Sequence, residues 1–111
     1  MTRGELETFA LGLPAVTKVV QWGASDVYKV GGKVFAIAGD DGVSFKVSEI
    51  GFKALTEGGP GRQAPDCAKG QWANVSLDVL PDADLTDWLT AAHRLIAAKL
   101  TRKLRAELGL A

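Results

Sequence analysis

The residues that could carry out catalysis are few in this chain of 111 residues. Its one histidine, His93, lies in a helical pattern, where a structural or surface position is the usual one. Its one cysteine, Cys67, has no sequence neighbour that would activate the thiol, and a single cysteine excludes an internal disulfide or a multi-cysteine metal site. We therefore expect that the protein is not an enzyme and binds no cofactor.

Grouped carboxylates could bind a metal ion, but each group here has a structural explanation. Glu5 and Glu7 in the first helical segment offer too few oxygen ligands for a hard cation. Asp40 and Asp41 belong to a turn, and the acidic residues between 82 and 87 open a helix, where they favour its N-terminal dipole. No metal site is predicted.

The charges of the chain cancel, since 13 basic residues balance 13 acidic ones. Attraction to a nucleic acid or a membrane must therefore come from local clusters of charge. The clustered basic residues are Lys29, Lys46 and Lys69 in or beside expected strands, and Lys99, Arg102, Lys103 and Arg105 near the C-terminal end. The second cluster has an alternative explanation, because a helix C-terminus favours basic residues without any ligand.

A tryptophan in the stretch "KGQWANVSLD" is the residue that bears most on binding. In this stretch Ala73, Val75 and Leu77 alternate with Trp72, Asn74 and Ser76. Burying the three apolar residues sends Trp72 to the opposite face of the sheet. Trp72 then either centres an exposed surface together with Lys29 and Lys46 or packs beneath the loop over 58–70, and both alternatives stay open.

Four helices and an antiparallel sheet must position these residues. Two hairpin turns are expected, one at Gly31-Gly32 and one at Asp40-Asp41-Gly42 with Gly42 in the left-handed region. That geometry places Gly39 opposite Val43, Ile37 opposite Phe45 and Phe35 opposite Val47. The helix starts are Thr2 with Glu5, Ser48, the residues after Pro81, and Thr101.

This register assigns the side chains of the meander to two faces. The large ones, which are Tyr28, Val30, Phe35, Ile37, Val43, Phe45 and Val47, are expected on the core face. The second face is expected to be open to solvent and to carry Val27, Lys29, Val34, Ala36, Ala38, Ser44 and Lys46. The pattern predicts an α+β fold in one domain over residues 1–111.

Several motifs occur in an order typical of one family. They are Gln21-Trp22-Gly23, "VYKVGGKVFAIAG", the strand around Lys46, "KGQW" and "HRLIAAKLTRKLRAEL". Together they span nearly the whole chain, which resembles the MmcQ/YjbR family of small bacterial proteins. The resemblance implies a CyaY-like, frataxin-type two-layer α+β sandwich, with helices packed on one face of an antiparallel sheet.

The same resemblance implies DNA binding through a double-wing arrangement of the sheet. Thr101 departs from a common family proline, and "DCAKGQW" replaces a more basic, histidine-bearing approach to the tryptophan. The family's recurrent basic and aromatic positions fall on Lys29, Lys33, Lys46, Lys69, Trp72, Lys99 and Lys103, and the basic C-terminal cluster adds Arg102. The alternative is a non-enzymatic module that binds a protein partner on the sheet face around Trp72.

The N-terminal stretch "MTRGELETFALGL" contains spread charges and no continuous apolar segment, so it does not resemble a signal peptide. No run approaches the ~20 apolar residues of a membrane span. We therefore expect a cytoplasmic protein without membrane association. The pattern leaves the oligomeric state open.

Overall fold

The computed structural model describes residues 1–40 and 42–110, and it contains four helices and six strands in that part of the chain. The helices are α1 (Arg3–Leu11), α2 (Glu49–Thr56), α3 (Asp82–Ala97) and α4 (Arg102–Glu107). The strands are β1 (Val16–Gln21), β2 (Ser25–Val30), β3 (Lys33–Ala38), β4 (Gly42–Lys46), β5 (Arg62–Gln63) and β6 (Trp72–Ser76).

Side-chain caps begin three of the helices, as the sequence predicts. Thr2 and Glu5 form a reciprocal capping box at α1, in which Thr2 Oγ1 accepts from Glu5 N over 3.1 Å. Ser48 Oγ accepts from Gly51 N over 3.0 Å, and Thr101 Oγ1 accepts from Leu104 N over 3.1 Å. Each cap satisfies an N–H group that a helix start leaves without an internal partner.

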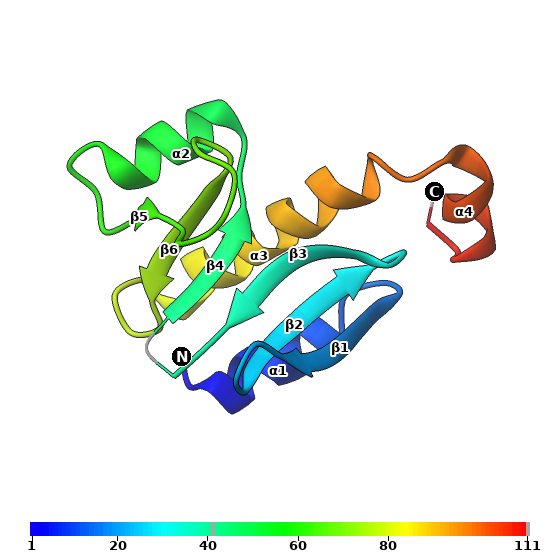
Figure 1. Cartoon of the computed structure of the whole chain (residues 1–111), viewed down its shortest axis with the longest axis horizontal. Coiled ribbons are helices and arrows are strands. Elements are labelled where there is room, and N and C mark those ends of the chain that lie inside the picture. The colour runs from blue at the N-terminus through cyan, green and yellow to red at the C-terminus, as the bar shows by residue number, and fades with distance from the viewer. Residues whose placement is uncertain (41, 111) are drawn as a thin grey trace.

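The strands form one antiparallel sheet in the order β1-β2-β3-β4-β6-β5. In Figure 1, α3 crosses behind the sheet. In the same view α2 lies toward the top and α1 toward the bottom, whereas α4 lies beyond one end of the sheet. The predicted α+β sandwich is confirmed. Strands β1 and β5, which the sequence reading missed, are its two edges.

The predicted register between β3 and β4 is wrong by one residue. Ala36 opposes Phe45 and Ala38 opposes Val43, because the turn closes one residue earlier than predicted, with Gly39 N donating to Gly42 O over 2.9 Å. On the other side of β3, a β-bulge in its pairing with β2 leaves Phe35 as an extra residue. Ala36 and Ala38 therefore face the helices and Ile37 faces away from them, the reverse of the prediction. Asp41, part of the predicted turn, lies outside the described residues.

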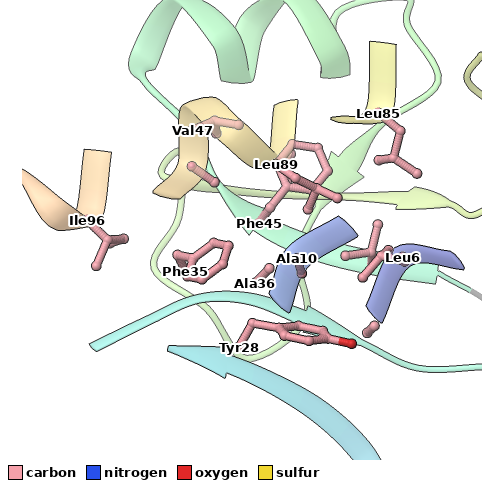
Figure 2. Packing of buried hydrophobic residues seen from close by; sticks show 14 of the residues in the cluster. Leu6, Ala10, Tyr28, Phe35, Ala36, Phe45, Val47, Leu85, Leu89 and Ile96 are labelled. Atoms are coloured by element: carbon pink, nitrogen blue, oxygen red, sulfur yellow. The ribbon is translucent and has the colours of Figure 1, made fainter. Parts of the chain in front are cut away.

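The core lies between the sheet and α1, α2 and α3. Figure 2 shows Phe35, Phe45 and Leu89 packed together, with Tyr28 beside Ala10 and Leu6. Strand residues of this face are fully buried because the apolar stripe of α3 covers them. This layer leaves the other side of the sheet, the open face, without helices.

The Gly31-Gly32 turn between β2 and β3 packs against the end of α3. Both glycines have positive φ, as predicted for this hairpin. A Cβ atom at Gly31 would lie 2.6 Å from Leu100 Cδ1, so a side chain at this position would force the buried Leu100 to move. The contact joins the end of the hairpin to the junction between α3 and α4.

No helix within residues 1–40 and 42–110 is long and apolar enough to cross a membrane.

Candidate functional site

The open face of the sheet is hollowed into a groove of about 770 Å³. Side chains from β2, β3, β4 and β6 form its floor, and the loop at 65–67 and two tryptophans border it. Its volume lies within the ordinary range for ligand pockets. The lining residues are Trp22, Ser25, Val34, Ile37, Gly42, Ser44, Pro65, Asp66, Cys67, Trp72 and Asn74.

The floor of the groove combines apolar and hydrogen-bonding groups. Val34 lies on this face as predicted, and Ile37 reaches it because the bulge at Phe35 reverses the orientation of the β3 residues that follow. Beside them, Asn74 Nδ2 donates to Ser44 Oγ over 3.0 Å. The carbonyl oxygen of this amide and the Ser44 hydroxyl hydrogen keep capacity for a ligand.

Trp72 lies on the open face, as the alternation in "WANVSL" predicts. It is half-buried, and it lines the groove together with Pro65 and Cys67 of the loop. The loop is fixed by Gln63, whose side chain donates to Ala64 O over 3.0 Å and accepts from Gly70 N over 2.9 Å. Trp72 is thus partly covered by the loop, yet still contributes a wall of the groove.

Trp22 borders the same groove from the turn between β1 and β2. Its side chain is 66% exposed, and its φ of 50° lies in the left-handed region, which bulky residues rarely adopt. The sequence reading used Trp22 only as part of a family motif and missed this position. The signal was available, because Gln21-Trp22-Gly23 has a large apolar residue where a turn needs a small polar one.

Lys46 is the cross-strand partner of Trp72, but it is buried rather than exposed as predicted. Only 7% of it is exposed, and its ammonium donates to Gln71 Oε1 over 2.7 Å. Burial lowers the pKa of Lys46, and the nearby charge of Lys99 lowers it further. The structure thus brings together two predicted residues that lie 53 positions apart in sequence, Lys46 from the sheet and Lys99 from the end of α3.

This lysine pair has no carboxylate partner. The ion pairs within residues 1–40 and 42–110 involve the amino terminus, Arg3, Lys18 and Lys53, and none includes Lys46 or Lys99. Two neighbouring lysines that share no ion pair with the described acids create a local positive potential in a chain of zero net charge.

The opposite arrangement occurs at the N-terminal edge of the sheet. Arg3 Nε donates to Asp26 Oδ2 over 3.0 Å, and its Nη1 donates to Asp40 Oδ1 over 2.7 Å. Lys18 is bonded to Glu7. These bonds raise the pKa of Arg3 and of Lys18, so the cations of this acid-paired edge are already neutralised within the protein.

The remaining predicted site residues are spread over two sides of the molecule. Lys29 is half-buried on the open face, opposite Val34, and Lys69 is exposed in the loop before β6. Lys33 opposes the buried Val30, so it lies on the helix side at the end of β3. Arg102 and Lys103 are exposed on α4, beyond that end of the sheet.

The residues considered for catalysis have structural surroundings. His93 Nε2 lies 2.8 Å from Pro14 O, and the imidazole contacts the Phe35 ring edge-on, with centroids 5.4 Å apart. Burial, and next the charge of Asp66, raise the pKa of the Cys67 thiol, which disfavours a reactive thiolate. In the described part of the chain, no three His, Cys, Asp or Glu residues are grouped as metal ligands.

Two solved structures share this fold. The crystal structure of Deinococcus radiodurans protein DR2400, a DUF419 domain, has a TM-score of 0.88 and 24% identity, over 99% of this chain and 89% of that one. The crystal structure of a protein from Pseudomonas syringae has a TM-score of 0.73 and 16% identity, over 86% of this chain and 99% of that one. No functionally curated protein matches the chain. The model of the YjbR family matches residues 11–95, and the chain therefore belongs to the YjbR family.

Proposed function

We propose that the protein is a non-enzymatic DNA-binding protein of the cytoplasm, and that it binds through the groove on the open face and the adjoining basic residues. The single observation that carries this proposal is the proximity of Lys46 and Lys99 beside Trp72, with no carboxylate of the described residues paired to either lysine. Phosphate groups supply the charge that this pair lacks. The family resemblance points to the same partner.

The burial of Lys46 makes a structural role for the lysine pair costly. An ammonium that is removed from water and placed near a second ammonium destabilises the folded protein unless an anion approaches. The one described partner of Lys46 is the neutral Gln71 side chain. A bound phosphate oxygen would relieve the repulsion and would receive charge-assisted hydrogen bonds.

Titration of fluorescent DNA with protein over a series of salt concentrations tests the proposal. Wild-type protein is expected to bind more weakly as salt increases, because the lysines displace condensed cations from the phosphates. Lys46→Met and Lys99→Met should each reduce the slope of log K against log salt by about 0.7–0.9, the value for one phosphate contact.

Lys53→Met is the matched control, since Lys53 is an exposed lysine on α2 that lies 3.9 Å from Glu49. This variant should bind like the wild type. Equal losses in all three variants would mean that only total charge matters, and absence of wild-type binding at low salt would refute the proposal.

A protein partner is the second candidate, and the free edge of the sheet favours it. Among the described residues, strand β1 pairs with β2 alone, and Val19 and Val20 are exposed on it. An extended segment of a partner could add to such an edge through main-chain hydrogen bonds. Binding of this kind should persist at high salt, whereas the proposed binding to DNA should not.

A further inference from the structure

The groove on the open face differs from the surfaces that proteins use to read a DNA duplex. Duplex readers insert a protruding helix or β-ribbon into the major groove. Here Trp72 borders a hollow, and the partly exposed Trp22 borders it from the other hairpin. A hollow with aromatic walls suits a flat group that enters it, and the bases of a duplex are stacked inside the helix.

We propose that the groove binds single-stranded nucleic acid, with an unpaired base against Trp22 and Trp72 and the adjoining phosphate at Lys46 and Lys99. This inference rests on the proposed function and specifies the form of its ligand. Stacking of bases on aromatic side chains beside a basic track is the common arrangement for single strands.

The distribution of charge around the groove fixes the orientation of the strand. Asp66 lines the hollow itself, so its carboxylate repels a phosphate there. Lys46 and Lys99 provide positive charge on the Trp72 side, because Lys46 is the direct cross-strand neighbour of that tryptophan. The base therefore occupies the hollow and the phosphate lies outside it.

The floor can form hydrogen bonds with the edge of an inserted base. Asn74 and Ser44 are bonded to each other but keep a free acceptor and a free donor, and Asp66 offers a further acceptor. Asparagine and aspartate are side chains that pair with the amino and ring nitrogens of bases. An uncharged peptide would find the same polar groups, but it would leave the lysine pair without an anion.

The backbone at Trp22 supports a role for its ring in binding. Asparagine adopts the left-handed conformation readily and tryptophan does not, so the turn would form more easily with asparagine. A strained, exposed aromatic residue is expected where function requires the side chain. Trp22→Asn should therefore leave the fold intact and remove one wall of the groove.

The single cysteine supplies a reporter of groove occupancy, because Cys67 lines the wall and has no competitor in the sequence. The test compares a fluorescent 12-nucleotide single strand, its duplex, and a strand of equal charge without bases. For each ligand, the affinity and the rate of Cys67 alkylation by a maleimide are measured.

The single strand is expected to bind at least tenfold more tightly than the duplex or the base-free strand, and it alone should slow alkylation of Cys67. Trp72→Ala and Trp22→Asn should each weaken single-strand binding by about tenfold, and Trp72→Phe should restore most of the loss.

If the duplex binds as tightly as the single strand, or if bound single strands leave the alkylation rate unchanged, this inference is wrong while the proposed function stands. If none of the three ligands binds at low salt, the proposed function fails as well.

Discussion

The acid-paired edge and the lysine pair both contain cationic side chains, but only the cations of the edge are bonded to carboxylates. At the edge, Arg3 contacts Asp26 and Asp40, and each cation is matched inside the protein. Lys46 is more deeply buried than Arg3, yet its described neighbours are Gln71 and another lysine. The first arrangement stabilises the fold, whereas a buried ammonium near a second ammonium costs stability.

The comparison shows why counting charges is a poor guide to this protein. The chain has no net charge, so a uniform distribution would attract no polyanion. Ion pairs neutralise Arg3 and Lys18 at the edge, whereas Lys46 and Lys99 take part in none of the ion pairs within residues 1–40 and 42–110.

The largest effect is expected from Gly31→Ala, which disturbs the support of the lysine pair. The new Cβ atom would overlap Leu100, which follows Lys99, and alanine would adopt a positive φ there. We expect a loss of about 3 kcal/mol in the free energy of unfolding, measured by urea denaturation. Gly32→Ala, which has positive φ but nothing within 4 Å, should lose only about 1 kcal/mol, and equal losses would contradict the steric explanation.

Removal of one cation from each region should affect stability in opposite ways. Arg3→Met leaves Asp26 without its main partner and should lower the free energy of unfolding by about 2 kcal/mol. Lys46→Met removes a buried ammonium but keeps its aliphatic volume, so stability should remain equal or increase. Chemical denaturation of both variants checks this, and a marked loss in Lys46→Met would show that the lysine pair is structural.

The pH dependence should separate binding from stability. The pKa of Lys46 is lowered in the folded protein, so its ammonium loses its proton below the pH range of an ordinary lysine. DNA affinity should fall as pH rises through that folded pKa. Stability should rise over the interval from the folded pKa to the unfolded one, because the unfolded chain then holds more protons.

Fluorescence anisotropy and denaturant titrations at several pH values measure these two quantities. In Lys46→Met both trends should disappear. A wild-type affinity that stays constant until ordinary lysines titrate would mean that Lys46 makes no contact with the ligand.

The smallest effect is expected from Tyr28→Phe, next to the acid-paired edge. Tyr28 is fully buried, and its hydroxyl has no hydrogen-bond partner in the described part of the chain. Burial, and next the charge of Asp26, raise the pKa of this phenol. Removal of an unsatisfied hydroxyl should leave the free energy of unfolding within about 1 kcal/mol of wild type, with no loss. A clear loss in thermal denaturation would reveal a partner for the hydroxyl.

The features that the sequence predicted well are local ones. The capping residues Thr2, Ser48 and Thr101 and the turn at Gly31-Gly32 act over a few positions, so their geometry can be read from residue type and spacing. The placement of Trp72 also succeeded, because β6 alternates regularly without a bulge.

The features that the sequence missed depend on contacts between distant segments. At the bulge, the ring of Phe35 packs on His93, which lies 58 positions away. Burial of Lys46 depends on Gln71 and Lys99, and the walls of the groove come from two separate hairpins and a loop. The alternation of residues within one strand does not show which distant segments of the chain will contact it.

The bulge at Phe35 also determines which side chains of β3 lie on the open face of the sheet. A strand has an inner and an outer set of residues, and one inserted position exchanges the two sets for everything that follows. Two alanines came to lie beneath α3, and an isoleucine came to the surface that meets other molecules. Deletion of this phenylalanine would remove the bulge, and strict alternation from Val34 would still place Ala36 and Ala38 beneath α3. A regular strand that kept all of its residues would instead place Ile37 in the core and the two alanines on the surface.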